Sequence, residues 1–106
     1  MNYIYRRNGK YFGFIRGNNF FDVNAKWLGW IEEGQVWREN GELLGELYEN
    51  KYILKNTIKL PPVPKVPPVP PTPTEPPVIS EDIIGKDAVI KDFVDALYVF
   101  DKIDDI

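Results

Sequence analysis

Residues 19–34 read NFFDVNAKWLGWIEEG, and this sixteen-residue pattern organises the first half of the chain. The same pattern reads YIYRRNGKYFGFIRGN over residues 3–18 and QVWRENGELLGELYEN over residues 35–50. A fourth copy begins KYILKNTIKL and meets proline at its eleventh position. Four copies of so short a unit predict a repeat-built domain over residues 1–60.

The sixth and seventh positions of each copy predict a hairpin tip. They read Asn8-Gly9, Asn24-Ala25, Asn40-Gly41 and Asn56-Thr57. Asn-Gly between apolar runs favours a two-residue type I′ turn, because both central residues need positive φ. Ala25 and Thr57 suit that turn less well, so a longer loop is the alternative at these two tips. A second set of tight turns is expected at Gly17-Asn18, Glu33-Gly34 and Glu49-Asn50.

These turns predict one register for an antiparallel meander of four hairpins. A two-residue first tip sets Tyr5 opposite Phe12 and Ile4 opposite Gly13. The equivalent pairs in the next two copies are Phe21–Leu28, Phe20–Gly29, Trp37–Leu44 and Val36–Gly45. The pairs expected between copies are Ile15–Phe20, Ile31–Val36, Trp30–Trp37 and Leu47–Tyr52. Each apolar cross-strand pair contributes a few tenths to about 1 kcal/mol.

The eleventh position of three copies is a glycine inside a predicted strand: Gly13, Gly29 and Gly45. Glycine in the interior of a strand weakens the sheet, so its recurrence here suggests that there is no space for a side chain. We expect a side chain or a neighbouring backbone to pass over the missing Cβ. A glycine shared by the copies also suits a closed ring in which the strands converge on an axis.

The alternation FFD, NAK and LGWI within residues 20–31 resembles the repeat of the bacterial four-fold β-flower domain. In that family four hairpins are arranged as petals about a pseudo-four-fold axis. The resemblance covers residues 3–60, implies a mainly β fold and supplies no catalytic residues to carry over. In the fourth copy Thr57 replaces the turn glycine and Pro61 replaces the strand glycine, so we expect a clipped last petal.

All ten prolines lie in the stretch LPPVPKVPPVPPTPTEPP, which predicts a polyproline II linker over residues 61–78. One interpretation is a semi-rigid spacer of roughly 50 Å. A second is a recognition segment, because Lys65, Pro68 and Pro71 match a basic-x-x-Pro-x-x-Pro ligand. A third is that the Val-Pro stretch lies along petal aromatics, on its own body or on a neighbour's.

Residues 79–106 predict an acidic amphipathic α-helix. Ser80 followed by Glu81 and Asp82 suits a helix N-terminus, where an acceptor side chain and negative charge stabilise free N–H groups. Apolar side chains then recur at spacings of three and four: Ile90, Phe93, Leu97 and Phe100. The apolar stripe of such a helix is expected to be buried against another surface. We expect this partner-docking helix to pack on the repeat body, on a copy of itself, or in another protein's groove.

Composition excludes several classes of function. The chain has no cysteine and no histidine, which removes disulfides, thiolate metal sites and the usual general base near neutral pH. Residues 1–60 carry nine Lys or Arg against seven Asp or Glu (+2), whereas residues 79–106 carry three against eight (−5). So weak a positive balance is not typical of a nucleic-acid-binding protein. No stretch is apolar enough for a signal peptide or membrane span, so we expect a cytoplasmic protein without membrane contact.

The remaining chemistry is aromatic. No phosphate-binding, dinucleotide-binding or nucleophile motif occurs, and we expect no enzyme, cofactor, metal site or catalytic residue. Fifteen Phe, Trp and Tyr occur, twelve of them before residue 53. A possible binding surface comprises Tyr11, Phe14, Trp27, Trp30 and Trp37. The leading hypothesis is a non-enzymatic interaction or assembly module that binds another protein or, as a homo-oligomer, a second copy of itself. The alternative is a small-ligand or glycan-binding domain that uses this aromatic face.

Overall fold

The computed structural model describes residues 1–58, 60, 62–78, 81–83, 85 and 93–101. Within these residues, eight antiparallel strands form one sheet whose order follows the sequence, and a 3-10 helix follows the last strand. The elements are β1 (Asn2–Tyr5), β2 (Tyr11–Arg16), β3 (Asn19–Asp22), β4 (Trp27–Glu32), β5 (Gln35–Arg38), β6 (Leu43–Tyr48), β7 (Tyr52–Asn56), β8 (Phe93–Asp95) and η1 (Ala96–Asp101). The predicted mainly β meander of hairpins is confirmed.

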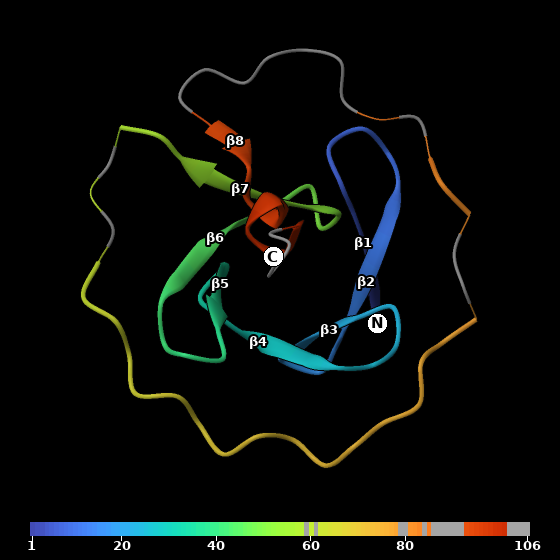
Figure 1. Ribbon diagram of the computed structural model, residues 1–106, viewed down its shortest axis with the longest axis horizontal. Helices are drawn as coiled ribbons and strands as arrows, with labels where there is room; N and C mark the ends of the chain where they lie inside the picture. The colour runs from blue at the N-terminus through green and yellow to red at the C-terminus, as the bar shows by residue number, and fades with distance from the viewer. Residues whose placement is uncertain (59, 61, 79–80, 84, 86–92, 102–106) are drawn as a thin grey trace.

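Consecutive strand pairs form four petals around a centre, as Figure 1 shows. Petal 1 is β1–β2, petal 2 is β3–β4, petal 3 is β5–β6 and petal 4 is β7–β8. The sheet curls until β1 approaches β7, where the Tyr5 amide donates to the Lys51 carbonyl at 2.8 Å. The helix η1 lies in the middle of the ring.

The tips of petals 1 to 3 differ from the predicted type I′ turn. At the first tip the Gly9 amide donates to the Arg6 carbonyl and the Arg6 amide to the Lys10 carbonyl, both at 2.8 Å. The same two bonds recur in petals 2 and 3, and the last loop residue carries the positive φ: Gly9 95°, Ala25 66° and Gly41 93°. This is a three-residue hairpin loop, a type I turn closed by a G1 bulge. The two-residue turn predicted at the Asn-Gly tips was therefore wrong.

The bulge moves one side chain per petal. Tyr5 faces Tyr11 rather than Phe12, although Ile4 faces Gly13 as predicted. Likewise, Phe21 faces Trp27 rather than Leu28, and Trp37 faces Leu43 rather than Leu44. The predicted pairs Phe20–Gly29 and Val36–Gly45 are confirmed. Because the bulged strand contains an extra residue, its tenth-position side chain turns toward the axis.

The core therefore collects the second, tenth and thirteenth positions of the repeat around the axis. Its buried members are Ile4, Ile15, Phe20, Leu28, Val36, Leu44, Ile53, Ala96 and Leu97. Leu97 of η1 is fully buried among the petal residues. Each fully buried aliphatic or aromatic side chain of this size contributes about 1.5–3 kcal/mol. Helix η1 thus completes the core of the ring.

Three of the pairs predicted between petals are confirmed, namely Ile15–Phe20, Ile31–Val36 and Trp30–Trp37. The fourth is wrong, because Leu47 faces Ile53 rather than Tyr52. The connection between β6 and β7 contains one more residue than the connections β2–β3 and β4–β5. Within it the Lys51 amide donates to the Tyr48 carbonyl at 3.1 Å. A shift of one residue exchanges the two faces of a strand. Ile53 therefore enters the core, while Tyr52 joins an outer cluster.

Petal 4 is completed from the far end of the chain. The pairs are Leu54–Asp95, Lys55–Val94 and Asn56–Phe93. The hairpin tip expected at Asn56-Thr57 is wrong, because no described residue between Asn56 and β8 forms a return strand, and proline cannot donate to a strand ladder. The α-helix predicted over residues 79–106 is wrong where the chain is described. Residues 93–95 form β8, and η1 begins where the Leu97 amide donates to the Asp95 carboxylate at 3.0 Å.

The proline-rich residues 62–78, which we call the strap, follow the outside of the petals (Figure 1). The Lys65 amide donates to the Gly41 carbonyl at 2.8 Å, and beyond the strap the Ile83 amide donates to the Gly9 carbonyl at 2.8 Å. A Cβ on Gly41 would overlap the Lys65 carbonyl oxygen, and one on Gly9 would overlap that of Ile83. Glycine at these tips therefore serves both the turn and the close approach of the outer chain.

We expect Gly41→Ala to release the strap. Gly34→Ala is the matched control variant, since the φ of Gly34 is also positive, at 78°, but a Cβ there would meet open space. Both variants lose about 1–2 kcal/mol from the left-handed conformation. Gly41→Ala should lose more in urea unfolding and should speed tryptic cleavage after Lys65. Equal losses and equal cleavage rates in the two variants would show that the strap does not depend on this contact.

Candidate functional site

The backbone of each following petal passes over a strand glycine, as predicted. A Cβ on Gly13 would overlap the Phe21 carbonyl oxygen, one on Gly29 that of Trp37, and one on Gly45 that of Leu54. The petals consequently approach closely along the pairs β2–β3, β4–β5 and β6–β7, which we call junctions 1, 2 and 3.

Stacked aromatic pairs fill the outer side of junctions 1 and 2. In junction 1 the rings of Phe14 and Phe21 stack with centroids 5.0 Å apart and an interplanar angle of 18°. In junction 2 the rings of Trp30 and Trp37 stack at 6.3 Å and 17°. Phe14, Trp30 and Trp37 are 0, 7 and 2% exposed. These three members of the predicted binding surface are therefore packed inside the junctions.

The other two predicted surface residues, Tyr11 and Trp27, lie half-buried in different petals. Tyr11 makes edge contacts with Tyr3 and Tyr5 at 5.5 and 6.0 Å. Burial raises the pKa of Tyr11, and the neighbouring Tyr3 and Tyr5 raise it further. The Trp27 indole nitrogen donates to the Asn19 side-chain oxygen at 3.2 Å. The structure thus distributes the five predicted residues over several places rather than one open surface.

One basic side chain joins the outer aromatics of junction 1 to the strap. The Arg16 guanidinium lies 5.0 Å from the centroid of the Phe14 ring. It also donates to the Thr74 hydroxyl at 2.6 Å and to the Glu75 carbonyl at 2.8 Å. One arginine therefore covers a junction and anchors the strap.

Lys65 performs the same double role at junction 2. Its ammonium lies 4.7 Å from the centroid of the Trp37 ring and 2.6 Å from the Glu32 carboxylate. The Glu32 carboxylate also accepts the Trp30 indole N–H at 3.3 Å. The hydrogen bond from Lys65, and then that from Trp30, lowers the pKa of Glu32 below its ordinary value of 4.5.

Junction 3 has no aromatic pair at the positions that hold the stacked rings in junctions 1 and 2, and its facing tyrosines, Tyr48 and Tyr52, lie further along the strands. Its register places Glu46 opposite Leu54, at the positions occupied by Phe14 and Phe21 in junction 1. A cavity of about 180 Å³ lies here, and it is lined by Gln35, Leu43, Leu44, Gly45, Glu46, Leu54, Lys55, Asn56, Leu60 and Pro62. The empty space thus lies at the junction where the twelfth position of the repeat is not aromatic.

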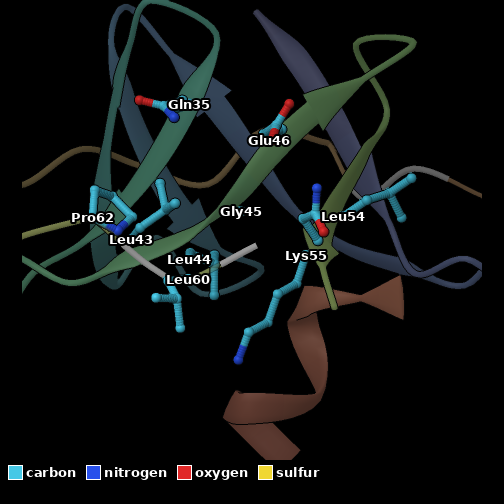
Figure 2. Close-up of a pocket in the computed structure, with 10 residues that line it drawn as sticks. Gln35, Leu43, Leu44, Gly45, Glu46, Leu54, Lys55, Leu60 and Pro62 are labelled. Carbon is cyan, nitrogen blue, oxygen red and sulfur yellow. The ribbon is translucent and has the colours of Figure 1, made fainter. Parts of the chain in front are cut away.

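The cavity has apolar walls and polar rims. Figure 2 shows Leu43 and Pro62 on one side and Leu54 on the other, with Gly45 between them. Glu46 and Gln35 stand at one rim, and the Lys55 side chain extends away at the opposite rim. Glu46 is half-buried, and within the described residues its carboxylate has no ion pair or side-chain hydrogen bond.

Three of the four predicted docking residues pack on the chain's own body. Leu97 is fully buried on the axis, and the Phe100 ring lies 5.6 Å from that of Phe12. Phe93 packs in the outer cluster with Tyr5, and Ile90 lies outside the described residues. Outside these contacts, Arg6 and Asp101 form a bidentate ion pair at 2.6 and 2.8 Å.

The described residues contain no group of three or more acidic, cysteine or histidine side chains placed to hold a metal ion. Among them, too, no helix combines the length and the apolar character that crossing a bilayer requires.

A comparison with known families accounts for this architecture. Residues 1–82 match the family described as 4-fold beta flower protein. The chain belongs to this family. No curated protein and no solved structure matches the chain. The match to the beta flower family covers petals 1 to 3, β7 and the strap, and it stops before β8 and η1.

Sequence reasoning missed the cavity of this beta flower. The signal was present at the twelfth position of the repeat, which reads Phe14, Trp30 and then Glu46. A carboxylate in a series of aromatic residues marks the junction that packing leaves open. The identity of the facing residue, Leu54, depended on the longer third connection and could not be read from the repeat.

We expect Glu46→Phe to stabilise the protein, because the new ring would fill junction 3 as Phe14 fills junction 1. A gain of about 1 kcal/mol corresponds to a rise in Tm of roughly 4–8 °C for a domain of this size. The matched control is Glu39→Phe at an exposed position, which should leave Tm unchanged or lower it. Calorimetry measures both, and a lower Tm for Glu46→Phe would contradict the assignment.

We expect acid to loosen the strap at Lys65. The folded-state pKa of Glu32 is depressed, so its contribution to stability is present above about pH 4.5 and is lost as the pH falls through the lowered pKa. Tryptophan fluorescence measures this directly, since Trp30 and Trp37 adjoin the Glu32–Lys65 pair. In Glu32→Gln the acid-dependent change should be smaller. An identical titration in both proteins would exclude Glu32 as the responsible group.

Proposed function

We propose that this chain is a non-enzymatic interaction module whose strap serves as a rigid proline-rich ligand for an aromatic-lined groove of a partner protein. The observation that carries the proposal is the three-residue period of the strap. Every third residue from Pro64 to Pro76 is proline, and polyproline II has three residues per turn. The strap therefore has three ridges of distinct composition.

One ridge faces the body and two face outward. The inner ridge contains the partly buried residues Lys65, Pro71, Thr74 and Pro77. The first outer ridge contains Val63, Val66, Val69 and Val78, which are 84, 91, 89 and 86% exposed. The second outer ridge contains the exposed residues Pro64, Pro67, Pro70, Pro73 and Pro76.

The outer ridges together form a repeated Val-Pro surface. Val63-Pro64, Val66-Pro67 and Val69-Pro70 follow one another at intervals of one turn, about 9 Å in polyproline II. Aromatic-lined grooves recognise such segments through prolines spaced three residues apart. The spacing and the exposure both suit this mode of recognition.

The ligand register suggested by Lys65, Pro68 and Pro71 is less well placed. Lys65 is already paired with Glu32 and lies over Trp37, and Pro71 is partly buried. A partner that approaches from outside would meet the valine and proline ridges instead.

Anchoring to the body favours binding by the strap. The bonds from Lys65 to Gly41 and from Arg16 to Thr74 hold it at two separated points. A ligand that is ordered before binding loses less conformational entropy when the complex forms. The folded chain should therefore bind a groove more tightly than the free peptide does.

The shape of the strap favours a foreign groove over a second copy of this chain. Figure 1 shows the strap running around the outer circumference of the petals, so it is convex outward. A convex ridge fits a concave groove, and two such ridges bury little of each other. The glycan-binding alternative has less support, because Phe14, Trp30 and Trp37 are buried.

We expect the full chain to bind at least one member of a panel of SH3 and WW domains, measured by calorimetry. The double variant Val66→Ser, Val69→Ser should weaken that binding at least about tenfold, since each change removes buried apolar groups from the interface. The matched control is Thr72→Ser, an exposed change on the valine ridge outside the Val-Pro steps. It should bind like the unmodified protein.

Two results would overturn the proposal. One is the absence of binding to every domain of the panel by a chain whose folding is verified by calorimetry. The other is self-association in sedimentation that the valine variant abolishes, because the strap would then contact a second copy.

A further inference from the structure

We propose that the cavity of junction 3 is a binding site for a small planar aromatic ring that carries an ammonium group. The site uses residues of β6 and β7 together with Leu60 and Pro62, and not the outer ridges of the strap. It therefore stands independently of the proposed recognition by a protein partner.

The pseudo-symmetry of the ring indicates what the cavity lacks. Junctions 1 and 2 each hold two stacked rings at corresponding positions of the repeat. Junction 3 holds Glu46 and Leu54 at those positions. A ligand ring inserted between Leu54 and the strap would restore the packing that the other two junctions obtain from their own side chains.

The size and the walls of the cavity suit a single ring. Its volume is about 180 Å³. Apolar protein cavities of roughly 150 Å³ accept benzene. Leu44 and Leu54 are 3 and 2% exposed, so they form fixed walls, while Leu60 and Pro62 lie on the strap side. The aliphatic walls can contact both faces of a flat ring.

The charge at the rim selects the substituent. The half-buried carboxylate of Glu46 has no ion pair or side-chain hydrogen bond within the described chain. A carboxylate held in such a place favours a cationic donor, because charge-assisted hydrogen bonds are about twice as strong as neutral ones. The other charged group, Lys55, extends away at the opposite rim (Figure 2). The side-chain amides of Gln35 and Asn56 complete the polar lining.

The test uses the full chain and 2-phenylethylamine as the probe, followed by amide chemical shifts. We expect saturable shifts confined to the lining residues 35, 43–46, 54–56 and 60, with a Kd of about 1 mM or tighter. The matched probes are 2-cyclohexylethylamine, which keeps the charge without a flat ring, and 3-phenylpropanoate, which reverses the charge. Both should bind at least about tenfold more weakly.

Two variants separate the ring from the charge. Glu46→Gln should weaken 2-phenylethylamine at least about tenfold, whereas Glu39→Gln at an exposed position should not. Glu46→Phe should abolish binding while the protein stays folded, because its own ring would occupy the cavity. Absence of saturable shifts, shifts centred elsewhere, or equal affinity of the Glu46→Gln variant would overturn the proposal.

Discussion

The close approach of neighbouring petals is the constraint on which the other features depend. Backbone carbonyls pass over Gly13, Gly29 and Gly45 with no room for a side chain, and this brings the outer rings of adjacent petals into stacking contact. On the inner side, the same approach brings residues of all four petals into one core around Leu97. A sheet this small can bury both faces because one face points to the axis and the other is divided among the junctions.

The positions at which one copy of the repeat differs from the others make the petals structurally different. Glu46 stands where its counterparts are aromatic, and the third junction stays open as a result. Ala25 stands where two tips have glycine, and the strap amide bond seen in the described residues, from Lys65, goes to Gly41 rather than to that tip. Repetition produces the scaffold, and the substituted positions distinguish one petal from another.

Much of the fold could be predicted from the repeat, because Asn-Gly tips and strand glycines recur at fixed spacing. Pairs such as Ile4–Gly13 and Trp30–Trp37 followed directly. The bulge at each tip could not be predicted from the same letters, since Asn-Gly suits both a two-residue and a three-residue loop. Strand β8 could not be predicted either, because its partner β7 precedes the strap in the sequence and lies far from β8 along the chain. The spacing of Phe93, Leu97 and Phe100 is also ambiguous, since it fits both a helix and a short strand followed by a 3-10 turn. The candidate sites depended on these tertiary choices, and so they emerged only with the structure.

The completion of petal 4 by the last strand ties the ends of the assembly together. Strands β1 to β6 pair through local connections, whereas β7 and β8 are separated by residues 57–92. Pairing across so long a span raises the contact order and slows folding. We therefore expect three hairpins to nucleate first and the β7–β8 seam to close last. Opening of that seam would loosen the strap, because the strap lies in the chain between β7 and β8.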